Sequence, residues 1–151
     1  MNPLIRPWRQ VFNFSGRATR TEYGLYHLSF IGFYIAMEIV LFGVIGLTIG
    51  FAPTDRPAQP NMLMAILMGI YGLAWLVILI IFLVGHVSIG IRRLHDHGEP
   101  GIKYLLTFIP LVGFIFWLMM VFTRGDDFEN DYGPDPRNPN GTPEELGGVF
   151  S

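Results

Sequence analysis

Four chemically active side chains follow one another closely in the segment Arg92-Arg93-Leu94-His95-Asp96, directly after a long apolar run. Two guanidinium groups, an imidazole and a carboxylate at a helix end could bind an anionic lipid headgroup or an acidic segment of a partner. The alternative is structural. Arginines at the end of a membrane span act as topological anchors and favour the negative end of the helix dipole, with Asp96 paired to one of them. Further charged residues precede the first apolar run, and we group them with this segment as the candidate interaction cluster. Its members are Arg17, Arg20, Glu22, Arg92, Arg93, His95 and Asp96.

Histidine and acidic side chains in the same region could also serve as metal ligands or as a general acid and base. His95 and His97 form a His-x-His pattern, with Glu99 nearby and His86 earlier in the chain. Two side chains at this spacing do not share a helix face, and the sequence offers no second pair of ligands. Because cysteine is absent, thiolate nucleophiles and Cys-based zinc sites are excluded. We therefore predict no metal, no cofactor and no enzymatic activity.

A second candidate site lies within an apolar run. Glu38 stands at the midpoint of residues 25–52, where an ionised carboxylate is costly, and His27 and Tyr34 precede it at helical spacing. This candidate intramembrane polar site of Glu38, His27 and Tyr34 could form part of a proton or cation relay. The alternative is a protonated Glu38 that bonds to a neighbouring helix and holds the bundle together.

Composition indicates which elements must position these residues. Of the 151 residues, 51% are hydrophobic and only 15% are charged, whereas soluble domains usually carry about 25% charged residues. Three long apolar runs predict an all-α integral membrane protein with spans at about 23–51, 62–91 and 102–122. A capping box at Thr19-Arg20-Thr21-Glu22 predicts that the first of these helices begins at Thr19. Arg17 and Arg20 should lie on the same membrane side as Arg92 and Arg93, because both sets border the same ends of the first two spans, and we expect Glu22 to pair with one of these arginines. A short interfacial helix is expected over 7–14.

The third run is interrupted by Pro110 and Gly113, which predict a kink or a re-entrant pair of half-helices. We expect one membrane domain over 1–136 and a disordered acidic tail over 137–151. With a cytoplasmic N-terminus and three spans, seven basic residues lie inside and three outside, which favours this orientation. If the third segment is re-entrant, the tail returns to the cytoplasm, and nine basic residues then lie inside and one outside.

Three short segments carry a family resemblance. The segment Phe14-Ser-Gly-Arg-Ala-Thr-Arg-Thr-Glu-Tyr23, the segment Arg92-Arg-Leu-His-Asp96 with Gly98 and Gly101, and Asn130 with Tyr132-Gly-Pro-Asp-Pro136 resemble the opening, central and closing motifs of domain of unknown function 805. These three motifs occur in the order and spacing of that family and frame nearly the whole apolar region. The resemblance implies a small protein of the bacterial inner membrane, and it implies no activity.

Two classes of function remain. The first is a non-enzymatic interaction, scaffold or lipid-contacting accessory protein, because the motifs concentrate at the predicted membrane interfaces. The second is a small oligomeric transporter or channel with Glu38 in its pathway. Membrane lipids are the expected partners, with a second copy or another membrane protein as further candidates. A net charge of −2 argues against a nucleic-acid partner.

Overall fold

The computed structural model describes residues 5–50 and 62–139, and the side chains of residues 47–50 are outside that description. The regular elements of the described residues are all helical: α1 (Arg6–Arg9), α2 (Arg20–Gly50), α3 (Met62–His95), the 3₁₀ helix η1 (Gly101–Phe108) and α4 (Val112–Phe122). The predicted all-α class is confirmed for this part of the chain. The predicted polar turn at 53–60 and residues 140–151 of the predicted disordered tail lie outside the described residues.

The chain divides into two compact units. The first contains residues up to His27 and those from Leu83 onward, and the second contains Leu28–Phe82. Both α2 and α3 therefore contribute residues to each unit. Each unit is described separately below.

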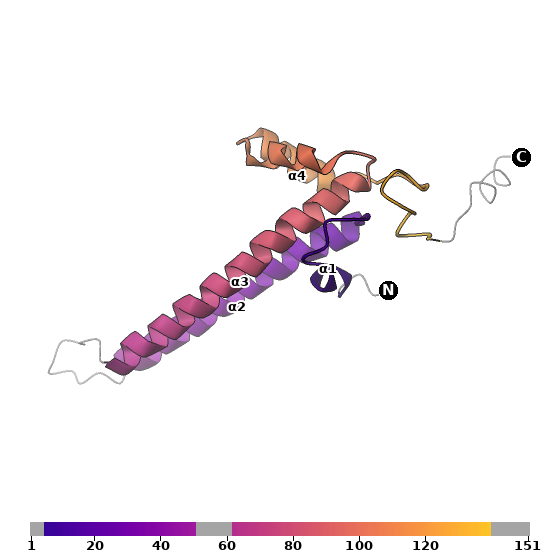
Figure 1. Cartoon of the computed structure of the whole chain (residues 1–151). Helices are drawn as coiled ribbons and strands as arrows, with labels where there is room; N and C mark the ends of the chain where they lie inside the picture. Colours follow the sequence, from indigo (N-terminus) through magenta and orange to yellow (C-terminus); the bar gives the residue numbers. More distant parts are fainter. Residues whose placement is uncertain (1–4, 51–61, 140–151) are drawn as a thin grey trace, which may run out of the picture. The chain divides into compact units, whose positions relative to one another are not determined.

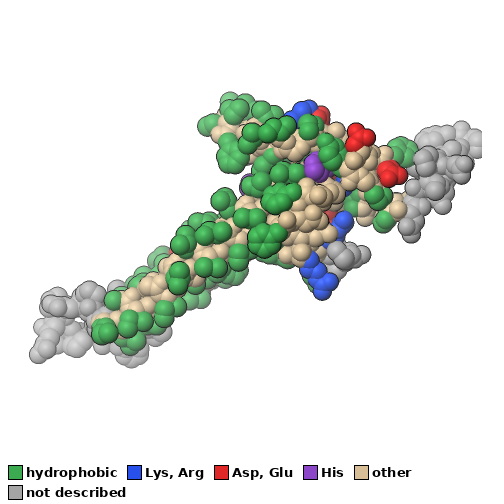
Figure 2. All heavy atoms as spheres, viewed as in Figure 1, with side chains coloured by type: hydrophobic (Ala, Val, Ile, Leu, Met, Phe, Trp, Pro, Cys, Tyr) green, Lys and Arg blue, Asp and Glu red, His purple; other side chains and the backbone are tan. Residues whose placement is uncertain are grey.

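In the second unit, α2 and α3 run side by side (Figure 1). The rings of Phe30 and Phe82 lie 4.6 Å apart, and those of Tyr34 and Trp75 lie 5.9 Å apart. Most large hydrophobic side chains of this unit are nevertheless exposed, as Figure 2 shows along its visible face. A soluble monomer rarely exposes so extensive an apolar surface, which is consistent with helices that face lipid.

Two helices have the length and composition needed to cross a bilayer. They are residues Arg20–Gly46 of α2 and Met62–His95 of α3, with 27 and 34 residues. A hydrocarbon core of about 30 Å requires about 20 residues of helix, so both segments are sufficient. Almost none of the most apolar part of either helix is buried, which distinguishes them from the core helices of a soluble protein.

The predicted start of α2 is confirmed. The backbone N–H of Thr19 donates to Glu22 Oε2 at 2.9 Å, and the backbone N–H of Glu22 donates to Thr19 Oγ1 at 3.2 Å. These two bonds are the reciprocal pair of a capping box. The helix then begins at Arg20.

The predicted interfacial helix over 7–14 is wrong in extent, because α1 ends at Arg9. The reason is a tertiary contact. The Ser88 hydroxyl lies 2.6 Å from the carbonyl oxygen of Asn13 and 3.2 Å from that of Gln10. The carbonyl of Asn13 bonds to Ser88 of α3, and that of Gln10 accepts from both Ser88 and the N–H of Asn13, so neither carbonyl continues an α-helix.

The third apolar run forms a helical hairpin. Its first arm, η1, packs on α3 through Tyr104, whose hydroxyl donates to the carbonyl of His86 at 3.2 Å. The chain reverses at Ile109–Leu111, where Leu111 has a φ of 67° and the N–H of Val112 donates to the carbonyl of Pro110 at 2.8 Å. The second arm, α4, returns to the end of α3. Of the two alternatives that Pro110 and Gly113 left open, a pair of half-helices describes the backbone better than one kinked helix.

The two arms of the hairpin approach closely at Gly113. A Cβ at this position would lie 2.8 Å from the carbonyl carbon of Thr107 and would overlap its oxygen. The backbone N–H of Gly113 also donates to the carbonyl of Ile109 at 2.7 Å. Only glycine allows this contact, so the residue expected to disrupt the helix instead brings its two halves together.

Candidate functional site

Asp96 is the centre of the polar core of the first unit. Its carboxylate is fully buried and accepts from Arg17 Nε at 3.0 Å and from Arg17 Nη2 at 2.9 Å. The other carboxylate oxygen pairs with Arg93 Nη1, and both guanidinium groups are also buried. One carboxylate therefore holds arginines from the opening and central motifs together.

Arg17 also fastens the closing segment of the chain. Its Nη1 donates to the carbonyl of Phe128 and, at 3.3 Å, to that of Gly133, while Nη2 donates to the carbonyl of Asp126. The backbone N–H of Asp126 donates to the carbonyl of Asp96 at 2.7 Å. The three motifs, of which the first and last are more than a hundred residues apart in the sequence, thus meet around one ion-paired cluster.

Arg93 connects the same cluster to the hairpin. Its Nε donates to the carbonyl of Met120 at 2.8 Å, and its Nη2 donates to that of Thr123. At 3.4 Å its Nη1 also reaches the carbonyl of Ala18. Because buried guanidinium groups are costly unless their N–H groups are bonded, this saturation indicates a structural role for Arg17 and Arg93.

The charge state of the cluster follows from its surroundings. Burial raises the pKa of the Asp96 carboxyl, and the guanidinium groups of Arg93 and Arg17 oppose that shift by stabilising the ionised form. Burial also lowers the pKa of the neighbouring His97 imidazole, to which the Arg93 charge adds. His97 is therefore neutral at pH 7, and Nε2 lies 3.3 Å from the Thr123 hydroxyl.

Glu22 has a different partner from the one expected. The sequence suggested an ion pair with Arg17, Arg20, Arg92 or Arg93, whereas the carboxylate pairs with Arg6 of α1 at 3.1 Å. The capping box holds the carboxylate at the start of α2, and α1 brings Arg6 to it. Glu22 is buried, so this pair fixes α1 against α2.

Replacing Glu22 by glutamine is expected to lower the free energy of unfolding by about 1 kcal/mol, since the ion pair is lost and the cap is weakened. Thermal unfolding in detergent measures the change. An Arg6→Gln variant should show a similar loss, and the double variant should lose less than the sum of the two single changes. Additive losses would argue against a pair between these residues.

The remaining members of the candidate interaction cluster differ in their surroundings. Arg92 is buried and donates to Gln10 Oε1, while its Nε has no partner among the described residues. His95 stacks on Tyr132 with ring centres 3.9 Å apart, and its Nδ1 lies 3.1 Å from the carbonyl oxygen of Gly16. Arg20 is exposed.

The potential metal ligands of the sequence do not assemble. His95 and His97 have the contacts given above, and Glu99 pairs with Lys103. His86 instead contacts His27 of α2, with Nδ1 and Nε2 of the two rings 2.8 Å apart. Among residues 5–50 and 62–139, no group of three His, Cys, Asp or Glu side chains is placed to hold a metal ion.

The three residues of the candidate intramembrane polar site, His27, Tyr34 and Glu38, all lie on α2 and have different surroundings. His27 belongs to the first unit and bonds to His86 and to the carbonyl of Tyr23, whereas Tyr34 and Glu38 belong to the second unit. Tyr34 contacts Trp75, and Glu38 is half-buried without a hydrogen bond or ion pair to the described residues. Sequence analysis missed the His27–His86 pair, although they are the only histidines within the first two apolar runs.

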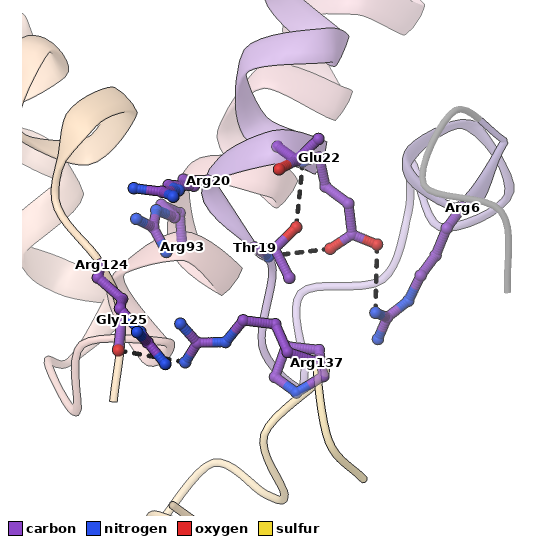
Figure 3. A pocket seen from close by; sticks show the side chains of 10 residues that line it. Arg6, Thr19, Arg20, Glu22, Arg93, Arg124, Gly125 and Arg137 are labelled. Carbon is purple, nitrogen blue, oxygen red and sulfur yellow. Dashed lines mark hydrogen bonds and ion pairs between the residues drawn. The ribbon is translucent and has the colours of Figure 1, made fainter. Parts of the chain in front are cut away.

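A cavity of about 390 Å³ opens beside the capping box of α2 (Figure 3). Among the described residues that line it, Glu22 is the only acidic one. The basic lining residues are Arg6, Arg20, Arg93, Arg124 and Arg137. Arg137, the first residue of the predicted disordered tail, donates from Nη2 to the carbonyl of Gly125 at 3.2 Å and pairs with Asp135 at 2.8 Å. Bonding to Asp135 raises the pKa of the Arg137 guanidinium against the effect of burial, so it stays charged.

Comparison with known proteins identifies relatives of this chain. It is 32% identical to inner membrane protein YhaI of Escherichia coli strain K12 over 124 residues, covering 82% of this chain and 86% of the relative. It is 28% identical to inner membrane protein YhaH of the same strain over 137 residues, covering 91% and 98% of the two chains. No solved structure shows a significant match.

The names of these relatives agree with the two long apolar helices and support the prediction of a bacterial inner-membrane protein. The family model described as protein of unknown function (DUF805) matches residues 11–134, which include all three motifs apart from the last residues of the closing one. The chain therefore belongs to the DUF805 family.

Proposed function

We propose that this protein is a non-enzymatic, multi-pass membrane protein that contacts anionic lipid headgroups at the cytoplasmic surface of the inner membrane. The observation that carries the proposal is the cavity with five arginines in its lining, which lies where α2 begins and α3 ends. Arginine side chains at this level of a membrane meet the phosphate groups of the lipids. The side chains that the sequence offered for acid–base chemistry, His86, His95, His97 and Glu99, are by contrast bonded to other side chains or to backbone.

The proposed topology has two spans and a re-entrant hairpin in place of three spans. Each arm of the hairpin is roughly 16 Å long, which is about half of a hydrocarbon core. Both ends of the hairpin are at the end of α3, because Gly101 contacts Ile91 and the carbonyl of Thr123 bonds to Arg93. The N-terminal and C-terminal segments then share the cytoplasmic side, which is the arrangement that the distribution of basic residues favours most.

Lipid retention tests the proposed function. The purified protein would be placed in nanodiscs with equal amounts of phosphatidylglycerol and phosphatidylcholine, and native mass spectrometry would count the lipids that remain bound. We expect phosphatidylglycerol to be enriched well above its share of the bilayer. Retained lipids that mirror the bulk composition would refute headgroup contact as the function.

Transport through a pathway containing Glu38 is the alternative. The observation that favours it is the carboxyl group of Glu38 in the second unit, which is half-buried and has no partner among the described residues. The cavity found in this unit is apolar and lined by Val40, Leu41, Val44, Leu67, Met68, Ile70 and Tyr71, which supports lipid contact better than an ion path.

Replacing Glu38 by glutamine should leave proton and cation flux in proteoliposomes unchanged at the background level of empty vesicles. A structural or lipid-facing carboxyl group tolerates the neutral isostere, whereas a proton carrier does not. Flux in the native protein that disappears in Glu38→Gln would establish the transport alternative.

A further inference from the structure

The cavity beside the start of α2 gathers guanidinium groups from five separate segments. Arg6 comes from α1, Arg20 from the first turn of α2 and Arg93 from the last turn of α3. Arg124 follows α4, and Arg137 lies in the closing segment. Figure 3 shows Arg20 beside Arg93, with Arg124 and Arg137 next to each other and Arg6 beyond Glu22. Segments so distant in sequence place five like charges around one space, which is unfavourable unless an anion offsets them.

The carboxylates around the cavity do not balance these charges. Arg17 and Arg93 share Asp96, and Arg124 and Arg137 share Asp127. Arg137 also pairs with Asp135, and Arg6 pairs with Glu22. Arg20 has no ion pair among the described residues. Six arginines, counting Arg17, therefore share four carboxylates, which leaves an excess of two positive charges.

The chemistry of the lining favours a phosphate group. Guanidinium groups bind phosphate through paired, charge-assisted hydrogen bonds, and a tetrahedral anion accepts bonds from several directions, whereas a carboxylate accepts mainly in one plane. The cavity volume of about 390 Å³ lies within the range of small-ligand sites. The hydroxyl of Thr21, also in the lining, adds a neutral donor.

We propose that this cavity is a phosphate-binding site in which Arg20 and Arg124 provide the most available donors. Arg20 is exposed and has no ion pair in the described part of the chain, and Arg124 is 67% exposed and makes a single surface ion pair there. The phosphate is the headgroup of an anionic lipid or a free phosphate ester. This assignment rests on the proposed contact with headgroups and makes it specific, because it confines binding to one cavity instead of the whole basic surface.

Two matched variants test the site. Arg20→Gln removes an exposed arginine of the cavity, and Arg9→Gln removes an exposed arginine of α1 that is outside the cavity. Within residues 5–50 and 62–139, neither arginine has an ion pair. Neither residue supports the ion-paired core, so both variants should melt at the temperature of the native protein. Arg20→Gln should weaken binding about tenfold, the loss of one charge-assisted hydrogen bond, and Arg9→Gln should change it less than twofold. Arg124→Gln is a second cavity variant, and it should also weaken binding.

Two arms distinguish the sources of phosphate. The first titrates inorganic phosphate against protein in nanodiscs of phosphatidylcholine alone. The second counts phosphatidylglycerol retained in mixed nanodiscs. If Arg20→Gln retains less phosphatidylglycerol but binds inorganic phosphate normally, the site takes a lipid headgroup. If Arg20→Gln binds inorganic phosphate more weakly, the site takes a free phosphate.

The outcomes also separate this site from the proposed function. If phosphatidylglycerol enrichment falls equally in Arg9→Gln and Arg20→Gln, or falls in neither, the cavity is not the binding site. General headgroup contact is then still supported. Phosphate binding that depends on Arg20 without any phosphatidylglycerol enrichment supports the site and overturns headgroup contact as the function. Absence of binding in both arms overturns both.

Discussion

Replacing Asp96 by asparagine is expected to lower the free energy of unfolding by roughly 3–5 kcal/mol, the cost of leaving buried charges without their partner. The Arg17 and Arg93 guanidinium groups are both buried and both pair with this carboxylate. An amide oxygen cannot compensate two positive charges. Since Arg17 also bonds to carbonyls of the closing segment and Arg93 to those of α4, the loss should loosen both segments.

Thermal and denaturant unfolding in detergent measure this effect, and Asp131→Asn is the matched control. Asp131 is exposed and makes no ion pair among the described residues, so its replacement should change stability by less than about 0.5 kcal/mol. Equal stability of Asp96→Asn and Asp131→Asn would show that the ion-paired cluster does not hold the first unit together.

Replacing Gly113 by alanine should be the second most damaging single change, with a loss of about 3 kcal/mol. The added Cβ overlaps the backbone carbonyl of Thr107, and backbone cannot rotate away as a flexible side chain can. The arms of the hairpin must separate, which weakens the packing of Tyr104 on α3. The variant should show lower thermal stability and greater protease sensitivity near residues 108–112.

Gly24→Ala is the control for this substitution. A Cβ at Gly24 meets nothing within 4 Å, so alanine in this helix should stabilise the protein by up to about 1 kcal/mol. A Gly113→Ala variant as stable as Gly24→Ala would contradict the close contact between η1 and α4.

Features that depend on local sequence were predictable. The capping box at Thr19 and Glu22 determines where α2 begins, and the length of the two apolar runs determines α2 and α3 as candidate spans. Pro110 lacks an N–H and so marked the interruption of the third run. The sequence also indicated that the arginines of the opening and central motifs lie together, because both flank the same ends of the first two spans.

Features that depend on tertiary contact were not predictable from local pattern. The bonds from Arg17 end on backbone carbonyls of residues 126–133, and carbonyls carry no signal in the residue types. The partner of Glu22 is Arg6 of α1, and the positions of these two residues in the sequence do not indicate that pair. His27 pairs with His86, 59 residues away, and no spacing rule within one helix indicates such a contact.

The central claim is that all three motifs meet at one membrane surface, and single-cysteine labelling tests it most directly. The chain contains no cysteine, so Ser15→Cys, Asn138→Cys and Gln59→Cys each introduce a single reactive thiol. A membrane-impermeant maleimide applied to intact spheroplasts should label Gln59→Cys only, and permeabilised cells should expose all three positions. Labelling of Asn138→Cys from outside, with Ser15→Cys protected, would place the closing motif across the bilayer from the opening motif and contradict the account.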